Sequence, residues 1–307
     1  PASLAEAQLA YRQEWAFALR LSGIMQELTD ALGAVENKRW AFVGTPAWLR
    51  YGKPGNVFGS EGYLRILAAD AEFFLDARKH LFAQGFRFIE ADVFTWRRFL
   101  NYRHHALLLR NEFVVDLSLK LHCCFAADFS STSTACSTEL LHTDGRQLPV
   151  LNDEYEMVYL LLLGYEMLCF GIPAHNTAIK TFLLLNAAAH KIEWDRFFEA
   201  RRREYTERLC KVFLFAVISL FDCLDDFPML GKHLAATPEA LVMTKQLAGQ
   251  SSNPERSGLP ARLARYLRNA PVISRRGIND VVRSCWPEDV FQRYRVRASR
   301  RILNRAS

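Results

Sequence analysis

Residues 63–75 read YLRILAADAEFFL and residues 113–121 read FVVDLSLKL, two apolar runs that each carry carboxylates. Runs of this kind between polar turns predict two strands. On the first strand, Asp70 and Glu72 are two residues apart, which places both side chains on the same face. Asp116 lies in the middle of the second strand, where an unpaired carboxylate would be costly to bury. If the two strands are neighbours, three carboxylates converge.

Three converging carboxylates repel one another unless cations lie between them. Mg²⁺, or Mn²⁺ in its place, suits such hard oxygen ligands. Two metal ions held in this way can activate an attacking hydroxyl group and stabilise a leaving pyrophosphate. Asp70, Glu72 and Asp116 are therefore the predicted metal ligands and catalytic residues. The alternatives are solvent-facing charges on an edge strand for the first two, and a buried ion pair for Asp116.

The rest of the chain predicts a mixed α/β region followed by helices, which is an α+β fold. Helices are expected over residues 1–35, 76–84, 154–170, 175–189 and 194–216, and strands over 40–44, 63–75, 86–90, 93–99, 105–109 and 113–121. The last two strands flank a polar turn and predict a hairpin. Three parts are expected: an α/β domain over 1–128, a helical domain over 129–250, and an Arg-rich segment over 251–307.

Several of these pieces, taken in order, resemble the polymerase-β-like nucleotidyltransferase superfamily, and above all its bacterial uncharacterised-nucleotidyltransferase branch. The resemblance rests on FVGTPAWLRY (42–51), LRILAADAEFF (64–74), a helix ending in Gly-Phe (85–86), VVDLSLKL (114–121) and LLLNAAAHKIEWDRF (183–197). It implies a mixed sheet flanked by helices, with Mg²⁺ at an acidic triad. The implied reaction moves NMP from an NTP to a hydroxyl or phosphate group of an unidentified acceptor.

The resemblance also implies a nucleotide site. Gly44 and Thr45 match a glycine motif at a helix start, where exposed N–H groups suit a triphosphate. Arg65 matches the arginine before the acidic pair, and Lys180 matches helical-domain lysines that approach a phosphate. The alternatives are a simple turn at Gly44, an ion pair with an acid for Arg65, and an ordinary surface lysine at 180.

Five further residues match family positions without a predicted catalytic role. They are His104 and His105 before the third carboxylate, and His190, Trp194 and Asp195 in the helical half. Surface positions are expected for the first two. A buried position in the helical core is expected for His190.

The chain departs from the family pattern at Thr45, Ala69, Ala71 and Ser118. The family or its branch commonly has Gly or Ser, Gly, a large aliphatic residue and His at these places. These departures keep a second function open, in which a catalytically degenerate relative binds a polyanion (RNA or a phosphorylated ligand) as a regulator or scaffold. A third possibility is a purely structural helical scaffold.

Charge is unevenly spread along the chain. Residues 254–307 contain thirteen Arg, no Lys and four acidic residues, a net charge of +9 within a total of +6, so the remainder carries −3. A basic segment on a slightly acidic body favours an anionic partner. Arginine in particular binds phosphate and carboxylate groups through two parallel hydrogen bonds. The alternative is a solvated helical face.

Cysteine usage and hydropathy favour a cytoplasmic protein. The seven cysteines are odd in number and show no paired metal-ligand spacing, which fits a reducing compartment. Zinc at His122, Cys123 and Cys124 is disfavoured, because adjacent residues of a strand point to opposite faces. No signal peptide or transmembrane segment is predicted, since the most apolar runs carry acidic residues or are too short. P-loop, dinucleotide, GxSxG and HExxH motifs are absent.

Overall fold

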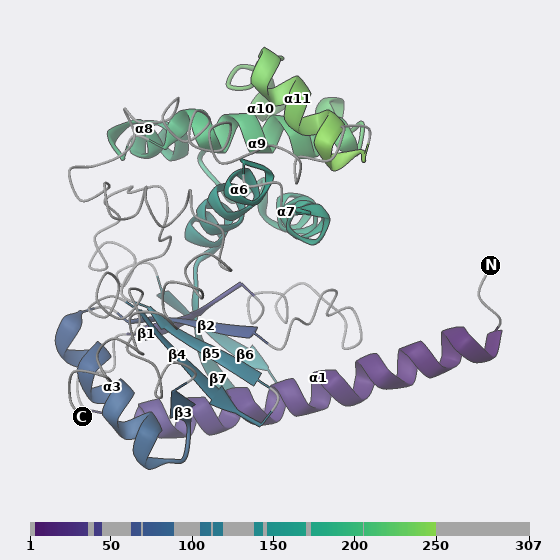
Figure 1. Ribbon diagram of the computed structural model, residues 1–307. Helices are drawn as coiled ribbons and strands as arrows, with labels where there is room; N and C mark the ends of the chain where they lie inside the picture. The colour runs from purple at the N-terminus through teal and green to yellow at the C-terminus, as the bar shows by residue number, and fades with distance from the viewer. Residues whose placement is uncertain are drawn as a thin grey trace, which may run out of the picture. The chain divides into compact units, whose positions relative to one another are not determined.

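The computed structural model describes residues 4–35, 40–44, 63–68, 70–88, 105–111, 113–118, 138–143, 146–169, 173–204 and 206–249. The described residues divide into two compact units, one that extends to Asn152 and one that begins at Asp153. The first unit contains a β-sheet with helices, and the second unit is helical (Figure 1). The α+β class predicted from the sequence agrees with this content.

Seven strands form one mixed sheet in the order β3-β4-β5-β2-β1-β7-β6. Their bounds are Trp40–Val43 (β1), Tyr63–Ala68 (β2), Arg87–Phe88 (β3), His105–Arg110 (β4), Phe113–Ser118 (β5), Thr138–Thr143 (β6) and Arg146–Leu151 (β7). At the centre, β2 runs parallel to β5 and antiparallel to β1. The strands β4 and β5 pair antiparallel, which confirms the predicted hairpin. The two predicted carboxylate-bearing segments are therefore neighbours in the sheet.

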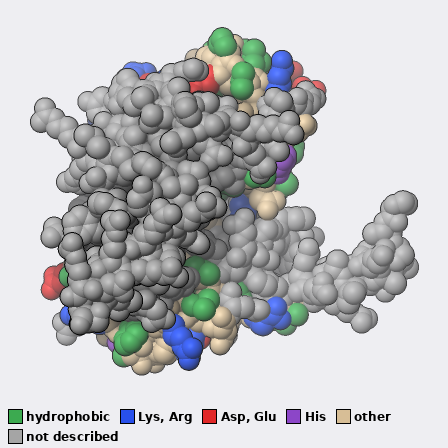
Figure 2. Space-filling view, viewed as in Figure 1, with side chains coloured by type: hydrophobic (Ala, Val, Ile, Leu, Met, Phe, Trp, Pro, Cys, Tyr) green, Lys and Arg blue, Asp and Glu red, His purple; other side chains and the backbone are tan. Residues whose placement is uncertain are grey.

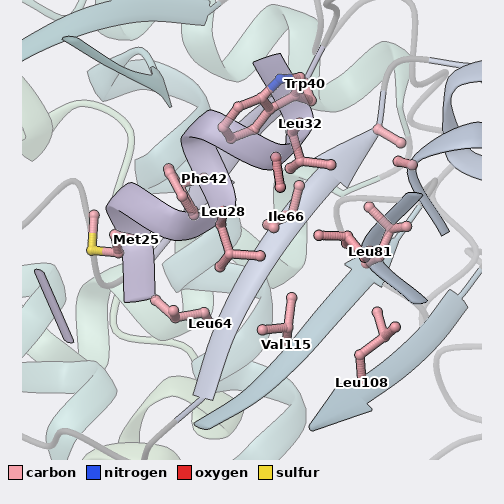
Figure 3. Close-up of a cluster of buried hydrophobic side chains, with 14 of the residues drawn as sticks. Met25, Leu28, Leu32, Trp40, Phe42, Leu64, Ile66, Leu81, Leu108 and Val115 are labelled. Atoms are coloured by element: carbon pink, nitrogen blue, oxygen red, sulfur yellow. The ribbon is translucent and has the colours of Figure 1, made fainter. Parts of the chain in front are cut away.

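Two helices, α1 (Leu4–Gly33) and α3 (Ala71–Ala83), share one buried core with alternate residues of the strands (Figure 3). Leu28 and Leu32 of α1 meet Leu64 and Ile66 of β2 in this core. Burial of each such side chain stabilises the fold by about 1.5–3 kcal/mol. Because side chains alternate along a strand, Arg65 points to the opposite face of the sheet.

The predicted strand over residues 63–75 is wrong in its second half. β2 ends at Ala68, and α3 begins at Ala71 with Asp70 as its N-cap. The physical reason is the helical spacing of apolar side chains from Phe73 to Leu81, which buries one face of α3 in the sheet core. Asp76, where the sequence predicted the start of this helix, lies inside α3 and is exposed. The predicted end of the helix near Gly85 is confirmed, and this glycine has a φ of 88°.

The hairpin β6–β7 was not predicted, and it extends the sheet. These strands pair antiparallel, and β7 joins the sheet by running parallel to β1. The sheet therefore continues to Leu151, beyond residue 128, which the sequence analysis gave as the end of the α/β domain. The predicted strand over residues 93–99 lies outside the described residues.

The described part of the second unit consists of helices. They are α6 (Asp153–Cys169), α7 (His175–Ala188), α8 (Trp194–Arg203), α9 (Glu207–Leu220), a 3₁₀ helix (Leu224–Asp226), α10 (Pro228–Gly231) and α11 (Pro238–Leu247). The single helix predicted over 194–216 is two helices, because the chain turns where the amide of Thr206 bonds the carbonyl of Arg201 at 2.8 Å. None of the described helices has the length and apolar composition to cross a bilayer.

Close packing between α6 and α9 depends on Gly164. A Cβ atom at this position would lie 2.0 Å from Cζ of Phe213, so only glycine lets the ring approach. Not all apolar side chains of this unit are buried. Leu241 and Val242 of α11 are exposed, and Figure 2 shows hydrophobic side chains on the surface of this region.

Candidate functional site

An ion pair joins the two central strands on the sheet face that α1 and α3 do not cover. Arg65 of β2 and Asp116 of β5 are direct register partners. The Nε atom of Arg65 donates a hydrogen bond to Oδ2 of Asp116 at 2.9 Å, and its Nη2 atom lies 2.8 Å from the same oxygen. Asp116 is fully buried, and the side chain of Arg65 is 14% exposed. The buried ion pair is one of the interpretations that the sequence left open for both residues.

The surroundings of this pair are buried and mostly apolar. Val43 of β1 is the register partner of Arg65 on the side away from Asp116. Val43, Leu67 and Ser118, which share this sheet face by alternation, are all buried. In such a low-dielectric setting the attraction between guanidinium and carboxylate is stronger than in water.

The other two predicted carboxylates are not on this face. Asp70 accepts a hydrogen bond from the amide of Phe73 at 2.8 Å, as a helix N-cap does. Glu72 is exposed in the first turn of α3, where a carboxylate interacts favourably with the helix dipole. From Arg65, β2 continues for three residues to Ala68, about 10 Å of strand rise, before Asp70 is reached. The prediction that three carboxylates converge is therefore corrected.

These positions do not fit the Mg²⁺ site that the resemblance implied. Ligand oxygens must lie about 2.1 Å from a shared Mg²⁺ ion. Oδ2 of Asp116 instead faces a guanidinium group, and Asp70 serves α3 as its cap. Among the residues that the structure describes, no group of three His, Cys, Asp or Glu side chains is placed to hold a metal ion.

Two of the residues predicted for a nucleotide site, Gly44 and Arg65, lie at neighbouring strands of the sheet. Gly44 follows β1 with a φ of 83°, a left-handed conformation that glycine adopts without strain. Val43 of β1 is the register partner of Arg65 in β2, and Gly44 is the residue that follows Val43. Thr45 lies outside the described residues. Lys180 lies half-buried on α7 in the second unit, and its contact with a phosphate stays a prediction.

Of the two histidines before the third carboxylate, His105 lies in β4, opposite Ser118 of β5. His104 lies outside the described residues. In the helical unit, His190 is exposed in the turn after α7, so its predicted place in the core is wrong. The turn ends the apolar helix two residues earlier, at Ala188.

Trp194 and Asp195 have structural partners in the helical unit. The indole Nε1 of Trp194 donates to the carbonyl of Ala189 at 3.0 Å and so fixes the turn between α7 and α8. Asp195 is exposed and accepts a hydrogen bond from Nζ of Lys232 at 2.6 Å. Both residues stabilise the helical unit locally.

Sequence analysis did not identify the buried guanidinium of Arg201. This side chain is 1% exposed, bonds the carboxylate of Glu204 and lies over the rings of Tyr155 and Phe197. The available signal was its place on the apolar stripe of α8, three residues after Phe198. Burial raises the pKa of Glu204 despite this pairing.

Two further groups in the helical unit have shifted pKa values with structural causes. Hydrogen bonding from Arg202 lowers the pKa of Glu207 to about 2, with Lys211 acting in the same direction. Burial raises the pKa of the Cys210 thiol to about 12. A thiol with such a pKa is protonated at neutral pH, as is typical of a buried structural cysteine.

Comparisons of the chain with protein-family models, with curated proteins and with solved structures found no match. They assign no family to the chain. The proposals below therefore depend on the residues and their geometry, together with the resemblance described above.

Proposed function

We propose that this chain is a nucleotidyltransferase-like protein that binds a polyanion and does not transfer nucleotidyl groups. It would act as a regulator or scaffold for that partner. The resemblance to the nucleotidyltransferase superfamily supplies the expected ancestry. The mixed sheet and the Gly44 turn after β1 agree with it.

One observation carries the proposal against catalysis. The described central strands β1, β2 and β5 contain a single carboxylate, that of Asp116, and Arg65 pairs with it. Metal-assisted transfer needs carboxylates that hold cations beside the reacting phosphate. Asp70 and Glu72 are placed on α3 instead, as a cap and as an exposed side chain. Within the part of the sheet that the structure describes, the carboxylates therefore do not form the acidic cluster that such a reaction requires.

The charge distribution supports a polyanionic partner. The net charge of +9 over residues 254–307 comes from arginine alone, whereas the rest of the chain is slightly negative. Guanidinium groups bind phosphate oxygens through two parallel hydrogen bonds. Neutralised phosphates release counterions, so such binding weakens steeply as salt rises. RNA is a suitable probe of this class.

The test is fluorescence anisotropy of a labelled single-stranded RNA with the full chain over a series of salt concentrations. The variant replaces Arg293, Arg295, Arg297, Arg300 and Arg301 with Gln. Each lost phosphate contact should reduce the slope of log K against log salt by about 0.7, or up to about 3.5 for five contacts. The matched control replaces two exposed arginines of the helical unit, Arg202→Gln and Arg203→Gln.

The expected result is salt-dependent binding that the five-arginine variant weakens and the control retains. A loss of log K per removed charge that is as large in the control as in the five-arginine variant would mean that net charge alone matters. Failure of the wild type to bind RNA, or Mg²⁺-dependent transfer of NMP to any acceptor, would contradict the proposed function.

A further inference from the structure

We propose that Arg65 is the built-in cation of Asp116, occupying the place of a divalent metal ion, and that a carboxylate at position 65 would open this place to Mn²⁺ or Mg²⁺. The inference deepens the proposed function and depends on it. It assigns the loss of metal-dependent chemistry to one residue of β2 rather than to a general erosion of the site.

Arg65 neutralises the buried charge of Asp116. A carboxylate as buried as that of Asp116 must be neutralised, either by protonation or by a nearby cation. The described strands β1, β2 and β5 contain one cationic side chain, Arg65, and it lies against this carboxylate. Val43, on the other side of Arg65, contributes no charge. The guanidinium therefore neutralises the charge of Asp116, as a metal ion neutralises clustered carboxylates.

The register of β2 and β5 would bring a carboxylate at position 65 opposite Asp116. Arg65 and Asp116 are direct partners on parallel strands, so their side chains leave the sheet on the same face. Neighbouring strands are about 4.8 Å apart. A carboxylate at position 65 would face Asp116 across this spacing, and each side could offer an oxygen to one cation about 2.1 Å away. One substitution thus converts an ion pair into two facing carboxylates.

No other described carboxylate of β2 or α3 is placed to serve with Asp116 as a second metal ligand. β2 reads YLRILA and contains no acidic residue, so position 65 is the nearest place in the strand for a second ligand. Asp70 is committed to the amide of Phe73 at the start of α3. The arrangement therefore predicts no metal affinity in the wild type at this place and measurable affinity after Arg65→Asp.

The experiment measures thermal unfolding of the full chain during titration with MnCl₂ and, separately, MgCl₂. The chains compared are the wild type, Arg65→Asp, and Arg65→Asp/Asp116→Asn, in which one of the two facing carboxylates is removed. At a metal concentration of about 100 times the dissociation constant, Arg65→Asp should gain about 5–10 °C in melting temperature. The wild type and the double variant should gain nothing.

A variant with two facing carboxylates can be too unstable to refold without metal. Purification of Arg65→Asp in the presence of MnCl₂ covers this case, because EDTA then removes the metal from a chain that has already folded. EDTA should lower the melting temperature of Arg65→Asp and leave that of the wild type unchanged. If neither added metal nor EDTA changes the melting temperature of Arg65→Asp, or if the wild type gains stability that Asp116→Asn abolishes, the inference is wrong.

Failure here is distinguishable from failure of the proposed function. The pair-replacement variant Arg65→Met/Asp116→Leu should bind the RNA probe as the wild type does, because Asp116 is fully buried and the side chain of Arg65 is only 14% exposed. Retained RNA binding, together with no metal response in Arg65→Asp, would overturn only the role of Arg65 as a substitute for metal. Lost RNA binding in a folded pair-replacement variant would instead mean that Arg65 contacts the partner.

Discussion

Removal of one member of the Arg65–Asp116 pair should destabilise the sheet unit far more than removal of both. In Arg65→Met a fully buried carboxylate loses its cation, and in Asp116→Leu a guanidinium that is 14% exposed loses its anion. Breaking a buried ion pair in this way costs about 3–5 kcal/mol. Arg65→Met should stand at the upper end of this range, because Asp116 has no access to water. The double variant Arg65→Met/Asp116→Leu should be within about 1 kcal/mol of the wild type or more stable.

Urea unfolding followed by circular dichroism gives the free energies, and hydrogen exchange of the β2 and β5 amides assigns them to the sheet unit. At about 2–4 °C per kcal/mol, the single variants should melt about 6–20 °C below the wild type. Arg203→Gln is the matched control, because it breaks an exposed pair with Glu199 and should cost at most about 1 kcal/mol. Two results would refute the reasoning. One is a loss in free energy of unfolding that is smaller in the single variants than in the control. The other is a double variant whose loss equals the sum of the two single losses.

Three further outcomes follow from local geometry. Gly164→Ala should destabilise the helical unit by about 1–3 kcal/mol in urea unfolding, because its methyl group would overlap the ring of Phe213; an unchanged midpoint would contradict the packing. Asp70→Ala should cost about 1 kcal/mol and Asp70→Asn almost nothing, since both Asp and Asn cap helices; equal losses would count against the capping role. The pKa of Glu207 is lowered to about 2 in the folded chain, so the stability it contributes is present above pH 4.5 and is lost as pH falls towards 2. Glu207→Gln should flatten the dependence of melting temperature on pH in this window, and a profile that keeps the wild-type slope would assign that slope to other groups.

Much of the fold could be predicted from local patterns. Apolar periodicity located α1, α6 and α7, and the polar turn between β4 and β5 predicted their hairpin. The error over residues 63–75 arose because a strand and a helix follow one another without a break in hydrophobicity. Asp70 was the available signal, since an aspartate before an amphipathic run is a typical N-cap. The hairpin β6–β7 also left a signal, the Asp-Gly pair at 144–145 between two apolar runs.

The candidate site was harder to predict because it depends on long-range pairing. An ion pair was one alternative for Arg65 and, separately, for Asp116. The sequence did not indicate that these two residues pair with each other. The two residues are 51 positions apart, and only the parallel register of β2 and β5 makes them partners. Because Asp70 was assigned to a strand, it was predicted to lie beside Asp116, and the pairing of Asp116 with Arg65 was missed. A shift of the strand end by a few residues thus changed the predicted chemistry from a metal cluster to a buried ion pair.

We propose that the Arg65–Asp116 pair holds no metal-dependent nucleotide site. The most direct test of this proposal is thermal unfolding of the wild type with a panel of NTPs, with and without Mg²⁺ or Mn²⁺, beside an Asp70→Asn/Asp116→Asn variant. A ligand that binds only the folded chain raises its melting temperature by mass action. The account predicts that metal adds no stabilisation to any NTP in either chain. Metal-dependent stabilisation of the wild type that the double variant loses would place a nucleotide at the carboxylates and contradict the account.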